Sequence, residues 1–133
     1  MATRRVIPLG ISILDLAVLA TRVEAQGGDE GCTPGFWRNH LLDWPATGFN
    51  TGDDFDTTFG VNFFTPNITL EQAVNLGGGG VRKLARHGTA GLLSAAHPNV
   101  DYPYTVAEVI AFVQAGNVDP LVAANELGCN VSN

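Results

Sequence analysis

The chain has 133 residues, a formal net charge of -6 and a hydrophobic fraction of 45%. These values predict a single domain with an ordinary hydrophobic core, and they exclude a disordered chain. The acidic balance argues against a nucleic-acid partner and against an anionic membrane surface, because Lys and Arg side chains supply most of the attraction to both.

The first 25 residues have the layout of a secretory signal peptide. Arg4 and Arg5 precede an apolar run from Val6 to Ala20, and the residues at 23 and 25 suit cleavage after Ala25. The run is shorter than the roughly 20 residues of a spanning helix, so we expect no stable membrane span. The segment therefore predicts a protein that is secreted or held at the cell surface.

Asp15 supports a second interpretation of the same segment, because a carboxylate inside the apolar part of a signal peptide is costly. The stretch after Gly10 resembles a type IV prepilin, in which cleavage follows a glycine and an acidic residue stands at the fifth mature position. A pilin helix needs about 20 apolar residues, whereas Arg22 interrupts this one early. Cleavage after Ala25 and cleavage after Gly10 both stay open.

The two cysteines, Cys32 and Cys129, flank most of the chain. In an exported protein they are expected to pair, and the alternative is two unrelated buried thiols. A bridge would close a loop of about 100 residues, which the chain-entropy model values at about 4.7 kcal/mol. We therefore divide the chain into a signal peptide at 1–25, a flexible leader at 26–31, a single helical domain at 32–129 and a tail at 130–133.

The stretch CTPGFWRNHLLDW, residues 32–44, begins the domain. Thr33 is suited to cap a helix with Pro34 in its first turn, and Pro45 is expected to end that helix. Four residues inside it follow the i, i+3, i+4, i+7 spacing of one helical face, namely Trp37, His40, Leu41 and Trp44.

Residues 48–66 predict a long ordered loop whose phenylalanines fill the core, with one short helical turn around 55–59. Capping boxes at Thr69 and Thr105 predict two later helix starts. Gly77 is expected to end the first of these helices, and the run of glycines at 77–80 predicts a hinge or a tight connection.

An apolar pattern of helical spacing covers 81–96. Gly88 and Gly91 within it predict the close approach of another helix, and His87 falls on the polar side. Asp119 is expected to cap a last helix that ends before Cys129. The fold class is therefore all-α, a small disulfide-closed bundle of four to five short helices with a long, loop-rich front half.

Three ordered motifs resemble a domain common in exported bacterial proteins. Its signature is Cys-Thr-Pro-Gly-Tyr/Phe-Trp-Lys/Arg-Asn-His followed by Trp-Pro, and here it stands as CTPGFWRNH with Trp44-Pro45. The second motif lies in GLLSAAHPNVDYPYTVAEVIAFV, residues 91–113, and the third is ELGC at 126–129. The resemblance implies export, a helical domain and an end-to-end disulfide. It implies no particular enzymatic activity, and it favours a structural or interaction role.

The opening motif has two interpretations. In the first, exposed indoles flanking a histidine form a platform for a sugar ring or a cation. In the second, the tryptophans form a buried stripe, with the histidine between them bonded to a backbone carbonyl. The side chains of Arg38 and Asn39 would then be left for binding. The candidate cluster comprises Trp37, Arg38, Asn39, His40 and Trp44.

No metal and no cofactor are expected. Asp53, Asp54 and Asp56 offer oxygen ligands for calcium, but their spacing is not that of an EF-hand loop, and a solvated acidic loop is the preferred interpretation. No two histidines have the i, i+4 separation of a ready ligand pair. Asn67 and Asn130 begin N-glycosylation sequons, which matter in a eukaryotic host.

The sequence thus predicts an exported structural or interaction module with no catalytic residues, whose partner is a protein, a glycan or further copies of itself. The alternatives are a carbohydrate-binding module that uses Trp37 or Trp44 and a subunit of an extracellular filament. A small hydrolase is the remote alternative, because no serine has an evident base and spacing does not single out a carboxylate pair such as Asp43 with Glu108.

Overall fold

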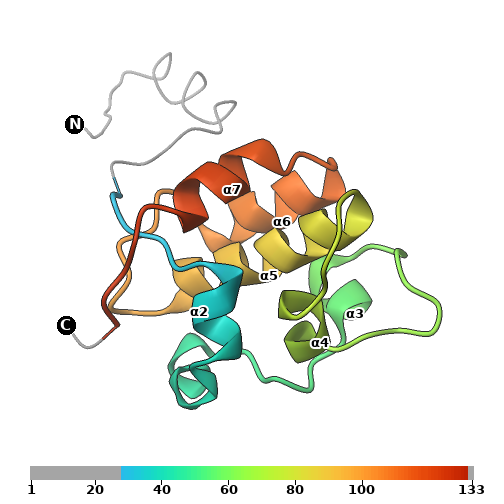
Figure 1. The fold of residues 1–133 in the computed structure, drawn as a ribbon, viewed down its shortest axis with the longest axis horizontal. Helices are drawn as coiled ribbons and strands as arrows, with labels where there is room; N and C mark the ends of the chain where they lie inside the picture. Colours follow the sequence, from blue (N-terminus) through green and yellow to red (C-terminus); the bar gives the residue numbers. More distant parts are fainter. Residues whose placement is uncertain (1–27, 132–133) are drawn as a thin grey trace, which may run out of the picture.

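A computed structural model describes residues 28–131 of the chain (Figure 1). The elements in chain order are α2 (Pro34–Arg38), the 3-10 helices η1 (Leu41–Asp43) and η2 (Pro45–Thr47), α3 (Phe55–Phe59), α4 (Leu70–Val74), α5 (Val81–Ala96), α6 (Val106–Gln114) and α7 (Asp119–Asn125). These residues contain isolated β-bridges but no strand, which confirms the all-α fold class. The expected signal peptide, with its alternative cleavage sites after Gly10 and Ala25, lies outside the described residues.

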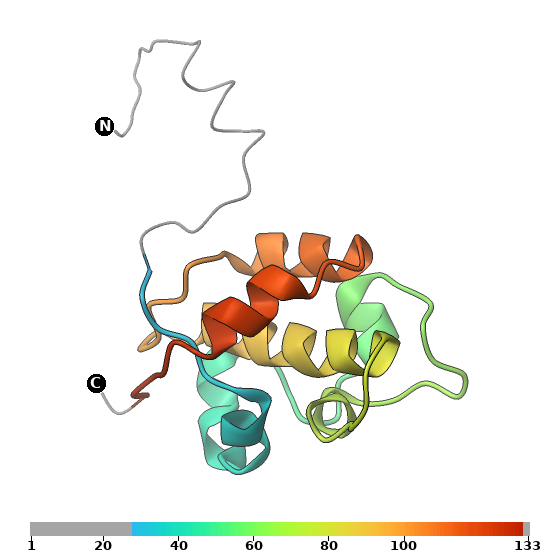
Figure 2. The same ribbon diagram turned by 45° about the horizontal axis from the view of Figure 1, so that its top comes forward.

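The long helix α5 is the centre of the fold, and α2, α4, α6 and α7 all contact it (Figure 2). A Cβ added to Gly88 would lie 2.5 Å from Val113 Cγ2 of α6, and one added to Gly91 would lie 2.8 Å from Tyr102 Oη. The predicted close approach at these glycines is confirmed. None of the helices in residues 28–131 is long and apolar enough to cross a bilayer.

Most of the predicted helix starts are present. Thr69 and Thr105 form complete capping boxes with Gln72 and Glu108, and Thr33 caps α2 with Pro34 in its first turn. The start of the last helix differs from the prediction that Asp119 caps it. Asp119 lies inside the first turn of α7, and the residue before it provides no side-chain cap.

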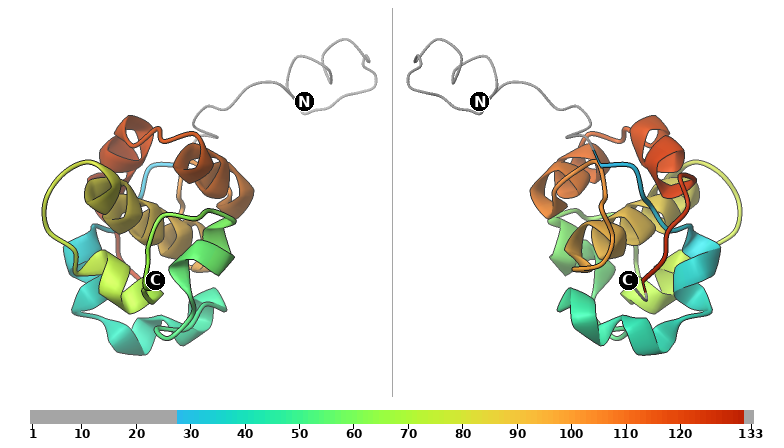
Figure 3. Two further views of the ribbon diagram at one scale, coloured as in Figure 1. Left: turned by 90° about the vertical axis from the view of Figure 1, so that its right-hand side faces the viewer. Right: turned by 90° about the vertical axis from the view of Figure 1, so that its left-hand side faces the viewer.

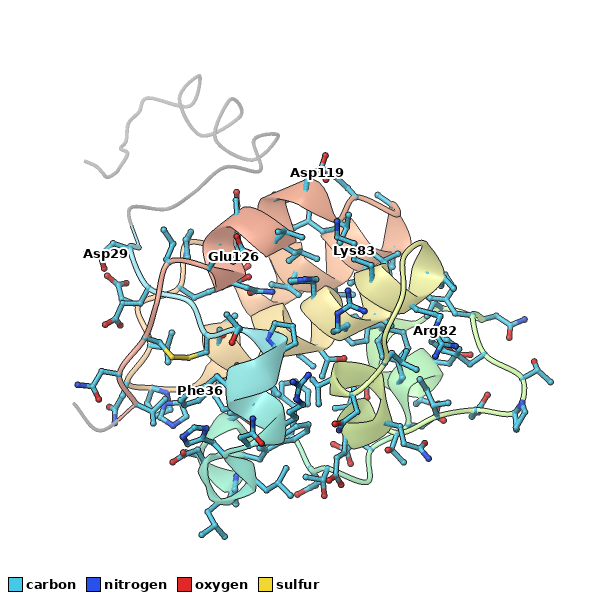
Figure 4. The ribbon with its side chains drawn as sticks, viewed as in Figure 1. Asp29, Phe36, Arg82, Lys83, Asp119 and Glu126 are labelled. Atoms are coloured by element: carbon cyan, nitrogen blue, oxygen red, sulfur yellow. A yellow bond between two sulfur atoms is a disulfide. The ribbon has the colours of Figure 1, made fainter. Side chains whose placement is uncertain are left out.

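The run of glycines between α4 and α5 is a tight connection. The side chain of Arg82 donates to Gly77 O at 2.7 Å, and Arg86 Nη1 donates to Leu76 O at 2.9 Å and to Gly78 O at 3.0 Å. Gly80 adopts φ 61° and ψ -136°, a conformation that in practice only glycine reaches. Two arginines of α5, of which Figure 4 labels Arg82, are therefore used to hold this connection.

The first helix is shorter than its apolar pattern predicts. In a continuing helix, the carbonyls of Gly35 and Phe36 would accept the N–H groups of Asn39 and His40. Instead, Asn39 Nδ2 donates to Gly35 O at 2.8 Å, and His40 Nδ1 lies 2.7 Å from Phe36 O. The helix ends at Arg38, and the chain continues in η1 and η2.

The two cysteines form the predicted disulfide, with a sequence separation of 97 and Cα atoms 5.3 Å apart. The bridge joins the two ends of the domain, and the first described residues run beside the last ones (Figure 3).

The prediction of a flexible leader at 26–31 is wrong for its second half. The Glu30 N–H donates to Asp101 O at 3.0 Å, and the Glu30 carboxylate accepts from the Asp101 N–H at 2.8 Å. The Gly31 N–H donates to Gly128 O at 3.1 Å, and a Cβ at this glycine would collide with Ala124 O. Glycine is needed here because two backbone segments touch.

The contact between α5 and α6 yields a stability prediction. Gly88→Ala places a methyl group against the buried Val113 side chain, and overpacking costs about 1–3 kcal/mol against a gain in helix propensity of about 1 kcal/mol. We expect the free energy of unfolding, measured by chemical denaturation, to fall by about 1 kcal/mol. Gly79→Ala is the matched control, because a Cβ there meets nothing within 4 Å. A Gly88→Ala variant at least as stable as the wild type would contradict the close approach.

Candidate functional site

One serine of α5 anchors the inward side of the opening motif. Ser94 Oγ accepts hydrogen bonds from the Cys32 N–H at 3.1 Å and from Trp37 Nε1 at 3.2 Å, and it lies 3.5 Å from Cys32 O, to which it can donate. Trp44 Nε1 donates to Trp37 O at 3.0 Å. The serine hydroxyl is buried and fully engaged, so it holds the motif in place and offers no free nucleophile.

Both indoles belong to the core. The exposed fraction is 0% for Trp37 and 1% for Trp44, and both ring N–H groups have partners. The interpretation of these residues as an exposed platform for a sugar ring is therefore wrong, and the buried stripe is correct for the tryptophans. It is not correct for His40 and Leu41, which are exposed because the helix ends before them.

The polar part of the motif ends the helix. Because a carbonyl only accepts, the short contact between His40 and Phe36 O assigns the donated proton to Nδ1. The imidazole also stacks on the ring of Phe36, with centroids 4.0 Å apart and planes 10° apart. Figure 4 labels Phe36 beside α2, where it packs partly against the core. Asn39 and His40 thus have a defined structural task in the turn.

The residues on both sides of this turn form the outer corner, which we define as Arg38, Leu41, Leu42 and Asp43. Leu42 is 95% exposed and Leu41 is 41% exposed, whereas the tryptophans on either side of the corner are buried. A hollow of about 130 Å³ lies beside it. The hollow is lined by Leu41, Trp44, Pro45, Phe49, Asn50 and Thr51.

The three acidic residues proposed for calcium do not converge. Asp53 Oδ2 accepts from the Asn50 N–H at 2.9 Å, and Asp56 Oδ2 accepts from the N–H groups of Phe63 and Phe64. Asp54 caps α3, and the hydrogen bonds from the Thr57 N–H and hydroxyl lower the pKa of its carboxyl. Within residues 28–131, no three His, Cys, Asp or Glu side chains are placed to hold a metal ion. The carboxylates organise the loop.

Asn67 and Asn130 are both on the surface. Their glycosylation stays a prediction that depends on the host.

A buried polar network, which the sequence did not predict, joins α5 to α7. Tyr102 Oη donates to Asn125 Oδ1 at 2.7 Å, and Asn125 Nδ2 donates to His87 O at 3.0 Å while lying 3.2 Å from His87 Nδ1. The hydrogen bond to His87 O shows that the Asn125 NH2 group, a donor, faces His87. His87 Nδ1 must therefore accept, so it is the unprotonated ring nitrogen. His87, expected on the polar side of its helix, is buried.

Burial is the main cause that lowers the pKa of His87 below its usual value of 6.5. The positive charges of Arg86 and Lys83 lower it further, whereas the carboxylate of Glu126 raises it. His87 is therefore held neutral by its surroundings as well as by its hydrogen bonds.

No family model matches the chain, and comparisons with curated proteins and with solved structures give no match either.

The His87 network predicts a pH-dependent stability. The lowered folded pKa means that the unfolded chain binds a proton first, so stability is complete above the unfolded pKa of 6.5 and is lost as the pH falls through it. We expect the free energy of unfolding to decrease from about pH 7 to about pH 5. His87→Gln, whose amide oxygen can still accept, should flatten this slope.

The wild-type protein, measured over the same pH range, is the reference for this slope. An unchanged slope in the His87→Gln variant would show that another group titrates in this window.

Proposed function

We propose that the protein is an exported interaction module whose task is to present the outer corner, in a fixed conformation, to another macromolecule. The observation that carries this proposal is the 95% exposure of Leu42 between two anchored tryptophans. Burying a leucine side chain is worth about 1.5–3 kcal/mol, which this residue forgoes in the isolated domain. A partner that covers it would recover that free energy.

The corner is supported at both of its ends. Trp37 precedes it and is bonded to Ser94, and Trp44 follows it and is bonded to the backbone of Trp37. The short turns between the tryptophans are closed by backbone bonds from Asp43 N–H to His40 O and from Trp44 N–H to Leu41 O. A surface that is ordered before binding loses less conformational entropy when the partner arrives.

Export is the part of this proposal that depends on the sequence. The signal-like N-terminal segment supports it, and so does the disulfide, because such bonds persist mainly in oxidising compartments. The resemblance of the CTPGFWRNH motif to a domain of exported bacterial proteins points in the same direction.

A photo-cross-linking amino acid at position 42, introduced into the full chain in cells that make the protein, tests this proposal. We expect a light-dependent adduct of one discrete mass. The same label at Leu127, which is 49% exposed and lies close to the disulfide in the sequence, is the matched control and should give no such adduct. Equal labelling from both positions, or none from position 42, would contradict an interaction role for the corner.

A further inference from the structure

The outer corner combines a projecting side chain with a neighbouring hollow. Leu42 projects into solvent, and the neighbouring hollow of about 130 Å³ has apolar walls from Leu41, Trp44, Pro45 and Phe49 and polar walls from Asn50 and Thr51. Leu42 does not line this hollow. The hollow is open to solvent, so a side chain of another molecule can enter it. A projecting leucine thus directly follows, in the sequence, a leucine that lines a hollow.

The same corner carries one charge of each sign. The exposed Arg38 precedes the corner leucines, and the half-buried Asp43 follows them directly. Within residues 28–131 neither side chain makes an ion pair, although only four residues separate the two in sequence. In a twofold arrangement, each cation can meet the anion of the other copy, so the face is complementary to itself in charge.

We propose that the partner of the corner is a second copy of this chain, in a twofold dimer that inserts Leu42 of each copy into the hollow of the other. Arg38 of each copy then faces Asp43 of the other. This inference rests on the proposed function and names its partner. Because the corner is small, the dimer is weak and forms in a concentration-dependent manner.

Two other surface grooves allow a different assembly. One lies between the start of α5 and the end of α6 and includes Phe63 and Val118, and the other includes Tyr104 and Leu127. Neither contains a corner residue, so insertion of Leu42 into either would join copies head to tail and produce open chains. The opposite charges within the corner favour the closed dimer. The mass of the assembly distinguishes the two arrangements, because a closed dimer stops at two copies and open chains continue to grow.

Sedimentation equilibrium of the mature, oxidised protein from micromolar to millimolar concentration tests this inference. We expect the mass to rise from monomer to dimer and to stop there. Leu42→Ser should weaken the dimer by about tenfold or more, the loss typical of a central interface side chain, and Leu127→Ser should leave it unchanged. A monomer at every concentration, or growth beyond the dimer, overturns the proposal.

Charge reversal gives the sharper measurement. Arg38→Asp and Asp43→Arg should each weaken the dimer, and the double variant should restore it, because the opposite charges meet again across the twofold axis. Both side chains lie outside the core, and far-UV circular dichroism checks that each variant is folded. A double variant that is no stronger than the single ones overturns the charge pairing.

The cross-linking experiment separates the two proposals. An adduct of twice the chain mass supports both of them. An adduct with a different protein, together with a monomeric sedimentation profile, retains the interaction module and overturns the dimer.

Discussion

The hydroxyl of Ser94 is the contact on which the front half of this fold depends. One buried oxygen receives the N–H of Cys32 and the indole N–H of Trp37, so the first cysteine, the first tryptophan and the central helix meet at one point. Leaving a buried donor without a partner costs about 1–3 kcal/mol. The disulfide then ties Cys32 to the far end of the domain, which fixes both ends relative to α5.

The hydrogen bonds to Ser94 explain why the motif at 32–44, although rich in polar and aromatic side chains, has a structural role in the fold. The tryptophans face inward, and the amide and imidazole that follow take the carbonyls that would otherwise prolong α2. Because the helix stops there, the chain turns sharply and carries Leu41 and Leu42 outward. The functional proposal follows from this turn, since a continuous helix would have directed Leu41 toward the core.

The parts of the fold set by local chemistry could be predicted, such as the capping boxes, the extent of α5 and the short helix at 55–59. The burial of both tryptophans was one of two interpretations that the sequence allowed, and it assumed a helix that in the structure does not reach Trp44. The early end of α2 was not predicted. The side chains of Asn39 and His40 bind carbonyl groups of the helix, and the spacing of apolar residues does not reveal such contacts. Gly31 and Asn125 were missed because their partners are distant in the sequence.

We conclude that the opening motif is anchored inside the domain and presents only its corner. Acrylamide quenching of tryptophan fluorescence tests it most directly, because the chain has two tryptophans and both lie in this motif. The native, oxidised protein should emit in the blue and resist quenching, whereas the reduced and denatured chain should emit in the red and be quenched strongly. Native emission that is red and quenched like that of the denatured chain would contradict the account.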